Sequence, residues 1–147
     1  MSLQPGASFF DSVESFEIVR SGKLDAVVLG AFQVDSFGNL ANWSSPNMVG
    51  GGIGGAMDLI ESGARIIVTM NHLDSEGGPK LVDRCSYPLT GLGCVDTVVT
   101  DLCLLGRHDG RFVLEELAPG FTLDEVLDLT GFQVAVSDDV RPLGQRA

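Results

Sequence analysis

Five glycines fall within the six positions 50–55, directly before the apolar sequence Ala56-Met57-Asp58-Leu59. Because glycine has no Cβ, the backbone N–H groups of such a segment can come close to a ligand or to a developing oxyanion. A helix that begins there adds the positive end of its dipole. The segment therefore predicts an anion-binding or oxyanion-stabilising site, and a loop whose glycines serve only tight turns is an equal alternative.

Two nucleotide-binding patterns were compared with this segment. Gly50, Gly52 and Gly55 satisfy G-x-G-x-x-G, but that pattern needs a strand leading directly into the loop, and residues 41–47 have the composition of a loop. The match is therefore weak. No Gly-Lys-Ser or Gly-Lys-Thr occurs in the sequence, which argues against a nucleoside triphosphatase.

The composition indicates one globular domain. The chain has 147 residues, of which 44% are hydrophobic, enough to form a core without disulfides. Nine basic against twenty acidic residues give a net charge of −11, which argues against nucleic-acid binding. Cys85, Cys94 and Cys103 have no C-x-x-C spacing, so we expect buried, reduced thiols and a cytoplasmic location. The sequence shows neither a secretion signal nor an apolar run long enough for a bilayer, and no membrane association is expected.

The first half of the chain predicts a strand–helix–strand crossover. Asp11, with Glu14 in a capping box, predicts a helix over residues 12–21. The continuous apolar runs in Asp25–Val34 and Arg65–Met70 are typical of interior strands of a parallel sheet. Between them a long loop leads into a short helix over Ala56–Ser62, which Gly63 terminates.

The second half predicts further strands and one more helix. We expect strands at residues 80–82, Val95–Leu105, Phe112–Leu117 and 134–136, with a hairpin turn at Asp109-Gly110. A capping box of Thr122 and Glu125 begins a helix that Gly131 closes, and the tail after Asp139 is expected to fray. The predicted fold class is α/β, a layered open mixed sheet flanked by helices.

Several blocks of sequence resemble one family. Gly30-Ala31-Phe32-Gln33-Val34, residues 38–43 and Gly54-Gly55-Ala56-Met57-Asp58-Leu59 are similar to the second (B, or β) subunit of family I CoA-transferases. Further blocks follow in the family's order: Val68-Thr69-Met70, His72, Lys80, Cys85, Pro88-Leu89-Thr90-Gly91, Thr100-Asp101 and Glu115-Glu116-Leu117-Ala118-Pro119-Gly120. The resemblance covers residues 6–136. It implies a CoA-transferase (NagB/RpiA-like) fold, incomplete at its N-terminus, with residues 1–147 as one domain.

The resemblance also implies a reaction. In the family, the glutamate of a Ser-Glu-Asn-Gly run forms a glutamyl-CoA thioester, through which CoA moves between an acyl-CoA, such as succinyl-CoA, and a 3-oxoacid, 3-oxoadipate or another short carboxylic acid. This sequence contains no such run and looks like the C-terminal two-thirds of the subunit. The isolated chain is therefore expected to be inactive. CoA would be a substrate, with no permanently bound cofactor, and the expected partners are the A (α) subunit and further copies of the chain.

The same resemblance assigns roles to residues. The backbone N–H groups of Gly54 and Gly55 would be oxyanion donors, and Gly52, Ala56 and Met57 would line the pantetheine or thioester pocket. Gln33 and Asn42 would hydrogen-bond the pantetheine amides, although side-chain amides near loops more often cap turns, and turn capping is the favoured alternative.

Other chemistry-bearing residues carry weaker signals. Trp43 would wall the pocket or pack in the core. His72 and His108 have no second histidine at metal spacing, and no metal site is expected. Glu115 and Glu116 point to opposite faces of a strand, which favours one exposed carboxylate beside a paired one over an acid/base pair.

Three positions depart from the family's pattern, and two of them remove positive charge. Relatives often carry lysines where this chain has Asn47 and Gly50, and an acidic residue where it has Asn71. The phosphates of CoA therefore lack an obvious local partner. A second hypothesis follows from the absent glutamate: a non-catalytic α/β ligand-binding or interaction domain that keeps the fold without the chemistry.

Overall fold

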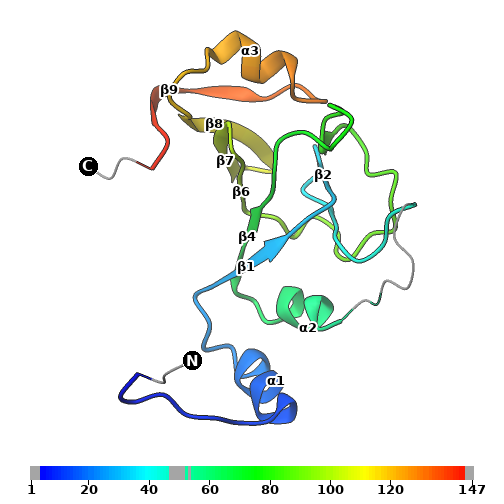
Figure 1. Cartoon of the computed structure of the whole chain (residues 1–147), viewed down its shortest axis with the longest axis vertical. Helices are drawn as coiled ribbons and strands as arrows, with labels where there is room; N and C mark the ends of the chain where they lie inside the picture. The colour runs from blue at the N-terminus through cyan, green and yellow to red at the C-terminus, as the bar shows by residue number, and fades with distance from the viewer. Residues whose placement is uncertain (1–3, 47–51, 53, 145–147) are drawn as a thin grey trace.

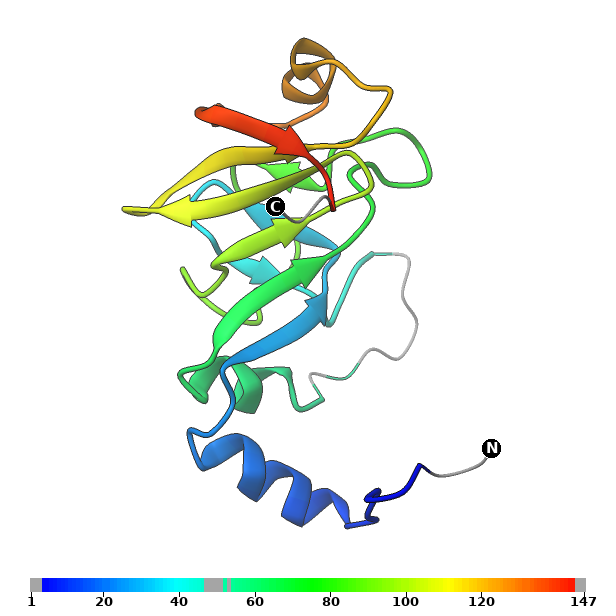
Figure 2. The same ribbon diagram turned by 90° about the vertical axis from the view of Figure 1, so that its left-hand side faces the viewer.

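A computed structural model describes residues 4–46, 52 and 54–144 of the chain (Figure 1). A six-stranded mixed sheet runs through the molecule in the order β1-β4-β6-β7-β8-β9. Its strands are β1 (Ala26–Gly30), β4 (Arg65–Thr69), β6 (Thr97–Val99), β7 (Cys103–His108), β8 (Arg111–Leu117) and β9 (Ala135–Pro142). Figure 2 shows these strands stacked in this order from the blue β1 to the red β9. The predicted mixed α/β sheet is confirmed.

The parallel part of the sheet is the predicted crossover. β1 and β4 pair in parallel, and so do β4 and β6, while β7 runs antiparallel to both of its neighbours. The prediction that β1 lies inside the sheet is wrong, because β1 forms one edge and Val28 is 63% exposed. Only one face of β1 packs against the core, and Val27 lies on that face.

A second sheet separates from the first directly after β1. It has the order β3-β2-β5, with β2 at Gln33–Asp35, β3 at Leu40–Ala41 and β5 at Leu81–Val82. The single strand predicted over Asp25–Val34 is therefore two strands in two sheets. The N–H of Phe32 donates to the carbonyl of Ala41 at 2.9 Å, so the chain has already joined β3 at this point. The strand expected at residues 80–82 is confirmed.

Three helices flank the sheets. α1 (Ser12–Arg20) is capped by Asp11, whose carboxylate accepts the N–H of Glu14 at 2.9 Å, close to the predicted bounds. α2 (Ala56–Glu61) lies beside α1 at the β1 end of the sheet (Figures 1 and 2). α3 (Leu123–Asp128) begins at Thr122 with the complete predicted capping box and lies over β9 at the opposite end.

Two predictions about the strands of the second half were wrong in detail. The run Val95–Leu105 contains a tight turn, because the hydroxyl of Thr100 accepts the N–H groups of Leu102 and Cys103 at 3.1 Å each and ends β6. The tail after Asp139 is not frayed up to Pro142, since Arg141 and Pro142 pair with β8. The turn at Asp109-Gly110 is confirmed, with φ of 49° and 80° as a type I′ turn requires.

Gly131 does not close α3, which ends at Asp128 with Leu129 as its cap. Its N–H instead donates to the carbonyl of Leu81 at 2.8 Å. A Cβ at this position would lie 2.5 Å from that same oxygen. Gly131 is therefore a point of close backbone approach, where the connection between α3 and β9 lies against β5.

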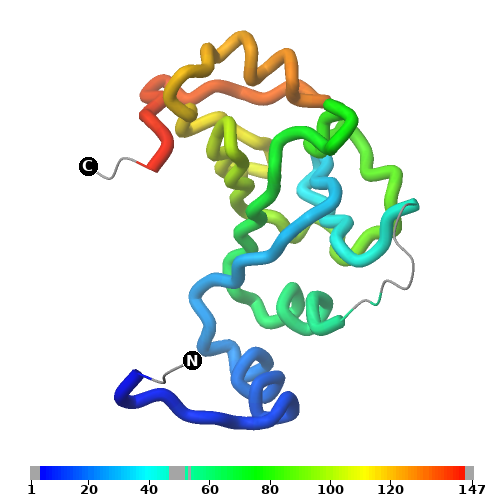
Figure 3. The backbone as a smooth tube through the Cα atoms, in the orientation of Figure 1, coloured from blue at the N-terminus to red at the C-terminus, as the bar shows by residue number. Residues whose placement is uncertain are grey.

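The core lies between the two sheets and beneath α3. Its members are buried aliphatic residues from nearly every strand, together with Val126 of α3; Val34, Leu40, Val68, Leu81, Val95 and Val98 are fully buried. The smooth backbone trace in Figure 3 shows the blue α1 segment at one end of the molecule and the red β9 segment at the other. None of the helices in the described ranges is long and apolar enough to cross a membrane.

Candidate functional site

The glycine segment is described in part. Gly50, Gly51, Ile53 and Asn47, four positions of the sequence predictions, lie outside the described residues. Gly54 is exposed and has a φ of +58°, in the left-handed region that favours glycine. It precedes Gly55, the residue that caps α2.

Gly55 has a packing role that the sequence did not reveal. A Cβ there would lie 2.5 Å from the ring of Phe16 on α1. The bare backbone therefore lets α2 pack against α1, and an ion pair between Arg20 and Asp58 joins the same two helices. Gly52, Ala56 and Met57 lie around this start of α2, and Met57 is 45% exposed.

Gln33 lies on β2, and Asn42 directly follows β3, in which Ala41 pairs with Gln33. The side-chain oxygen of Gln33 accepts the backbone N–H groups of Ser86 and Tyr87 at 2.9 and 3.3 Å. The side-chain oxygen of Asn42 accepts the hydroxyl of Thr90 at 2.7 Å. The oxygens of both side-chain amides thus hold the 86–90 segment against the small sheet. For these oxygens, the structure shows the turn-capping role that was the alternative to ligand binding.

Gln33 also lines a cavity of about 400 Å³, which we name the strand-end cavity. Its walls combine aromatic and aliphatic side chains with polar ones: Phe32, Gln33, Ser45, Asn71, Leu73, Asp74, Ser75, Pro79, Lys80 and Tyr87. Phe32 and Gln33 come just after β1, and Asn71 just after β4. Because these strands are parallel, their carboxyl ends lie at one edge of the sheet, where α/β proteins bind ligands.

Lys80 is the one cationic residue among those that line this cavity. Its backbone is held on both sides: its N–H donates to the carbonyl of His72 at 3.0 Å, and its carbonyl accepts the N–H of Val34 at 3.1 Å. Desolvation lowers the pKa of its ammonium, an effect that the negative charges of Asp101 and Asp74 partly offset. The side chain is half-buried.

His72 is fully buried behind the cavity and ties three elements together. Its Nδ1 lies 3.1 Å from the hydroxyl of Thr100, and its Nε2 lies 3.1 Å from that of Thr130. The Thr130 hydroxyl donates to Val126 at 2.8 Å, so it accepts from Nε2–H. This arrangement suits a neutral imidazole, and burial lowers the pKa of His72 accordingly, with Asp101 opposing that shift.

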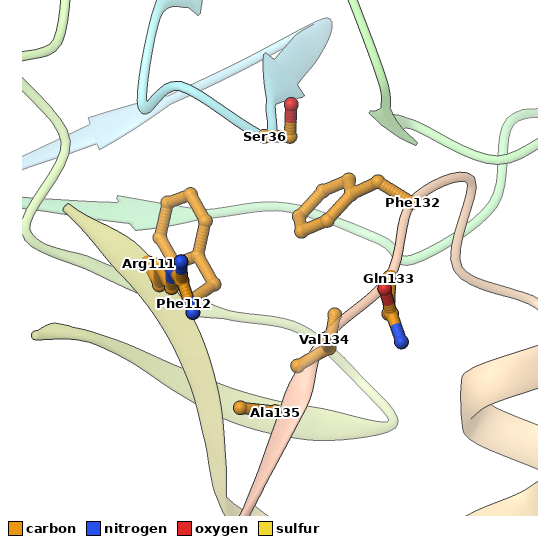
Figure 4. Close-up of a pocket in the computed structure, with 7 residues that line it drawn as sticks. All are labelled: Ser36, Arg111, Phe112, Phe132, Gln133, Val134 and Ala135. Carbon is orange, nitrogen blue, oxygen red and sulfur yellow. The ribbon is translucent and has the colours of Figure 1, made fainter.

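A second cavity, of about 440 Å³, lies between the end of β2 and the β8–β9 pair (Figure 4). Arg111 and Phe112 of β8 form one wall, and Phe132 to Ala135 form the other. The rings of Phe112 and Phe132 are tilted, with centroids 5.8 Å apart. None of the residues predicted to bind a ligand lines this cavity.

The two adjacent glutamates of β8 both have partners. Glu115 pairs with His108 of β7, and Glu116 pairs with Arg141 of β9 at 3.8 Å. The expectation that one carboxylate is exposed and unpaired is therefore wrong, and the two side chains do point to different neighbours. Within the described ranges, no group of three or more His, Cys, Asp or Glu side chains could hold a metal ion.

The three cysteines are free thiols. Cys103 is buried as expected, whereas Cys85 and Cys94 are half-buried. Desolvation raises the pKa of all three, to about 12 for Cys85 and about 11 for Cys103.

The structure therefore places the predicted residues in two groups. Gln33 belongs to the small sheet and lines the strand-end cavity, with Asn42 directly after β3, while Gly52, Gly54, Gly55, Ala56 and Met57 lie at the start of α2. The sequence analysis assigned no ligand role to Asn71, Lys80 or Tyr87, which complete the cavity. The signal that was available for Asn71 is its position directly after a predicted strand, since strand ends in parallel sheets collect ligand-binding residues.

A mixed sheet flanked by helices, with parallel strands at one end, defines an α/β protein. A family model described as Coenzyme A transferase matches residues 1–129. The chain is 44% identical over 131 residues to a probable coenzyme A transferase subunit beta of Bacillus subtilis (strain 168), covering 89% of this chain and 60% of that protein. It belongs to the Coenzyme A transferase family.

Two further comparisons agree. The chain is 40% identical over 149 positions to the mitochondrial succinyl-CoA:3-ketoacid coenzyme A transferase 2 of Homo sapiens, covering 100% of this chain and 29% of that protein. Its fold matches an acyl-CoA transferase (YdiF) of Escherichia coli O157:H7, solved as a thioester complex with CoA, with a TM-score of 0.80 and 20% identity over 92% of this chain and 31% of that one. The chain thus spans about 60% of the Bacillus relative and less of the longer ones.

Proposed function

We propose that this chain is part of a CoA-transferase that moves CoA between an acyl-CoA and a short carboxylic acid. The observation that carries the proposal is the family match over residues 1–129, together with identities of 40–44% to a subunit beta and to a succinyl-CoA:3-ketoacid transferase. The acid would be a 3-oxoacid, 3-oxoadipate or another short acid, and the reaction would be cytoplasmic. CoA is then a substrate rather than a resident cofactor.

In this proposal, residues 1–147 act as one B-subunit domain that supports the chemistry. Because the sequence has no Ser-Glu-Asn-Gly run, the nucleophilic carboxylate comes from outside these residues. The partners are an A subunit and further copies of the chain. The exposed apolar residues of α1 and the segment before it, including Phe9 at 84% exposure, support contacts of this kind.

The glycine segment would stabilise the oxyanion. When a carboxylate attacks a thioester, negative charge develops on the carbonyl oxygen, and losing one preorganised donor typically costs about 3 kcal/mol of transition-state stabilisation. The backbone N–H groups of Gly54 and Gly55 would supply such donors, with Gly52, Ala56 and Met57 beside the thioester. Gln33 and Asn42 would contribute at the pantetheine end. The exposure of Gly54 and Met57 supports their access to a ligand.

The experiment is a transfer assay in two steps. The purified chain is first incubated with succinyl-CoA and examined by intact-mass spectrometry, and we expect no covalent CoA adduct. The complete subunit is then assembled with its A subunit and assayed for acetoacetyl-CoA formation, and we expect turnover. A covalent thioester on a glutamate of the isolated chain would contradict the assignment of the nucleophile.

The glycine assignment needs a control for folding, because any side chain at position 55 strikes Phe16. Gly55→Ala is therefore compared with the double variant Phe16→Ala/Gly55→Ala, in which the ring is absent. Turnover that stays low in the folded double variant supports a role for the backbone in the reaction. Full turnover in both variants removes that role. A complete assembly that binds acyl-CoA without transfer would instead support the non-catalytic alternative.

A further inference from the structure

The strand-end cavity has a position and a lining that suit a small ligand. It opens at the carboxyl ends of β1 and β4, and its wall residues come from four separate segments of the chain. Phe32, Leu73 and Tyr87 offer apolar surface, while Asn71 and Ser45 offer hydrogen-bonding groups. Gln33 fixes the backbone of Tyr87 at 3.3 Å, so this part of the wall is preorganised.

Lys80 and Asp74 are the charged residues that line the cavity, and Lys80 is the one that can attract an anion. The ion pairs among the described residues are Arg20–Asp58, His108–Glu115 and Arg141–Glu116, and Lys80 takes part in none of them. A half-buried ammonium loses hydration without a close counter-ion. An anionic ligand group in the cavity would provide that counter-ion.

The two carboxylates near Lys80 are engaged by backbone groups. Asp74 accepts the N–H groups of Glu76 and Gly78 through Oδ1 at 2.9 and 2.8 Å. Asp101 accepts the N–H of His72 through Oδ1 at 2.7 Å. Each carboxylate is thus held to its own loop through Oδ1, and neither forms an ion pair with Lys80, so the ammonium stays available to a ligand.

We propose that the strand-end cavity binds the non-reacting carboxylate of a dicarboxylic acyl group, with Lys80 as the residue that selects for it. This inference rests on the proposed function, since it assigns the far end of the acyl substrate of that reaction. The aromatic walls contact the carbon chain, and Lys80 pairs with the carboxylate. Lys80 is thus a specificity-determining residue that takes no part in the transfer of CoA.

The chain offers a direct spectroscopic test because it has only two lysines, Lys23 and Lys80. Reductive methylation with ¹³C-formaldehyde gives one dimethyl-lysine NMR signal for each, and Lys23→Met and Lys80→Met assign them. In the free chain the Lys80 signal is expected to titrate below the ordinary range of a lysine, because desolvation lowers the pKa of its ammonium. Succinate is then added, with butyrate as the matched acid that lacks the second carboxylate and 3′,5′-ADP as a probe of the phosphates of CoA.

Succinate is expected to shift the Lys80 signal and to raise its titration midpoint, with Lys23 unchanged and butyrate far less effective. Lys80→Met should weaken succinate binding about tenfold, and Lys23→Met should leave it unchanged. Equal responses to succinate and butyrate would overturn the proposal. A stronger response to 3′,5′-ADP than to succinate would also overturn it, because the cavity would then hold a phosphate.

A second measurement separates this inference from the proposed function. In the assembled enzyme, Lys80→Met should lower kcat/KM for succinyl-CoA about tenfold and leave that for butyryl-CoA unchanged. Equal effects on both substrates in an active enzyme would overturn the role of Lys80 and leave the function standing. A succinate shift at Lys80 without any CoA transfer by the assembly would overturn the function and leave the binding site standing.

Discussion

Gly131→Ala tests the close approach between the α3–β9 connection and β5. The added Cβ would lie 2.5 Å from the carbonyl oxygen of Leu81 and 3.3 Å from the Cα of Val82, and both are backbone atoms. Leu81 is fully buried and its strand pairs with β2, so β5 has little freedom to move away. The connection must then shift, which strains or breaks the hydrogen bond from Gly131 to Leu81.

The magnitude follows from overpacking and from that hydrogen bond. Inserting a methyl group against a fixed neighbour lowers the free energy of unfolding by about 1–3 kcal/mol. This range includes the weakened hydrogen bond, because the same shift of the connection causes both effects. For a chain of this size, the midpoint of thermal unfolding should fall by roughly 3–10 °C. Circular dichroism measures the midpoint, and hydrogen exchange of the amide of residue 131 should speed up.

Gly30→Ala is the matched control. Gly30 lies in β1, and a Cβ there would meet no atom within 4 Å. Its substitution should leave the midpoint unchanged or raise it slightly, because alanine reduces the conformational entropy of the unfolded chain. If Gly131→Ala and Gly30→Ala unfold at the same temperature, the reasoning from close approach is refuted.

Three further predictions concern single side chains. Because burial lowers the pKa of His72, the unfolded state takes up a proton more readily, and the stability of the chain should fall as the pH drops below about 6.5. The denaturant midpoint of His72→Gln should fall less steeply with decreasing pH than that of the unsubstituted chain, and equal slopes would contradict this. Raised pKa values at Cys85, Cys94 and Cys103 predict slow reaction of the native chain with Ellman's reagent at pH 7.5 and three rapid equivalents after unfolding; three rapid equivalents in the native chain would refute this. Thr122→Ala should cost about 1 kcal/mol in urea unfolding by removing the cap of α3, and a loss within error of zero would argue against the capping role.

Local signals predicted the helices and the hairpin turn because they act within a few residues. Asp11 and Thr122 cap the helices that were expected, and Asp109-Gly110 has the positive φ angles that its turn needs. These features depend on side chains and backbone groups that are neighbours in the sequence. They could therefore be identified without knowledge of the tertiary structure.

The strand boundaries depended on contacts distant in sequence. The run Asp25–Val34 gives no sign that Phe32 bonds to Ala41 and leaves the first sheet. The run Val95–Leu105 contains no glycine or proline that would mark a turn. The hydroxyl of Thr100 makes the turn by accepting two backbone N–H groups, and hydrophobic periodicity does not detect such bonds. The end of β9 is polar, and its pairing with β8 comes from the sheet rather than from its own pattern.

The candidate site shows the same division. Gln33 was predicted to bind a ligand, and in the structure it lines a cavity. Lys80 lies 47 positions later and reaches the same cavity because β5 pairs with β2. Gly55 was identified for its bare backbone, yet its contact with Phe16 depends on how two helices pack. Long-range topology therefore decides which polar residues share a site.

The split between local and distant pairing also has a consequence for the order of folding. The β7–β8 hairpin closes through two residues, whereas Ala26 of β1 pairs with Arg65, 39 positions later. Closing the longer loop costs more entropy and is expected to be slower. We expect β7 and β8 to gain protection first in pulse-labelled hydrogen exchange, and β1 last. The end of the molecule that carries the glycine segment would then be the last to assemble.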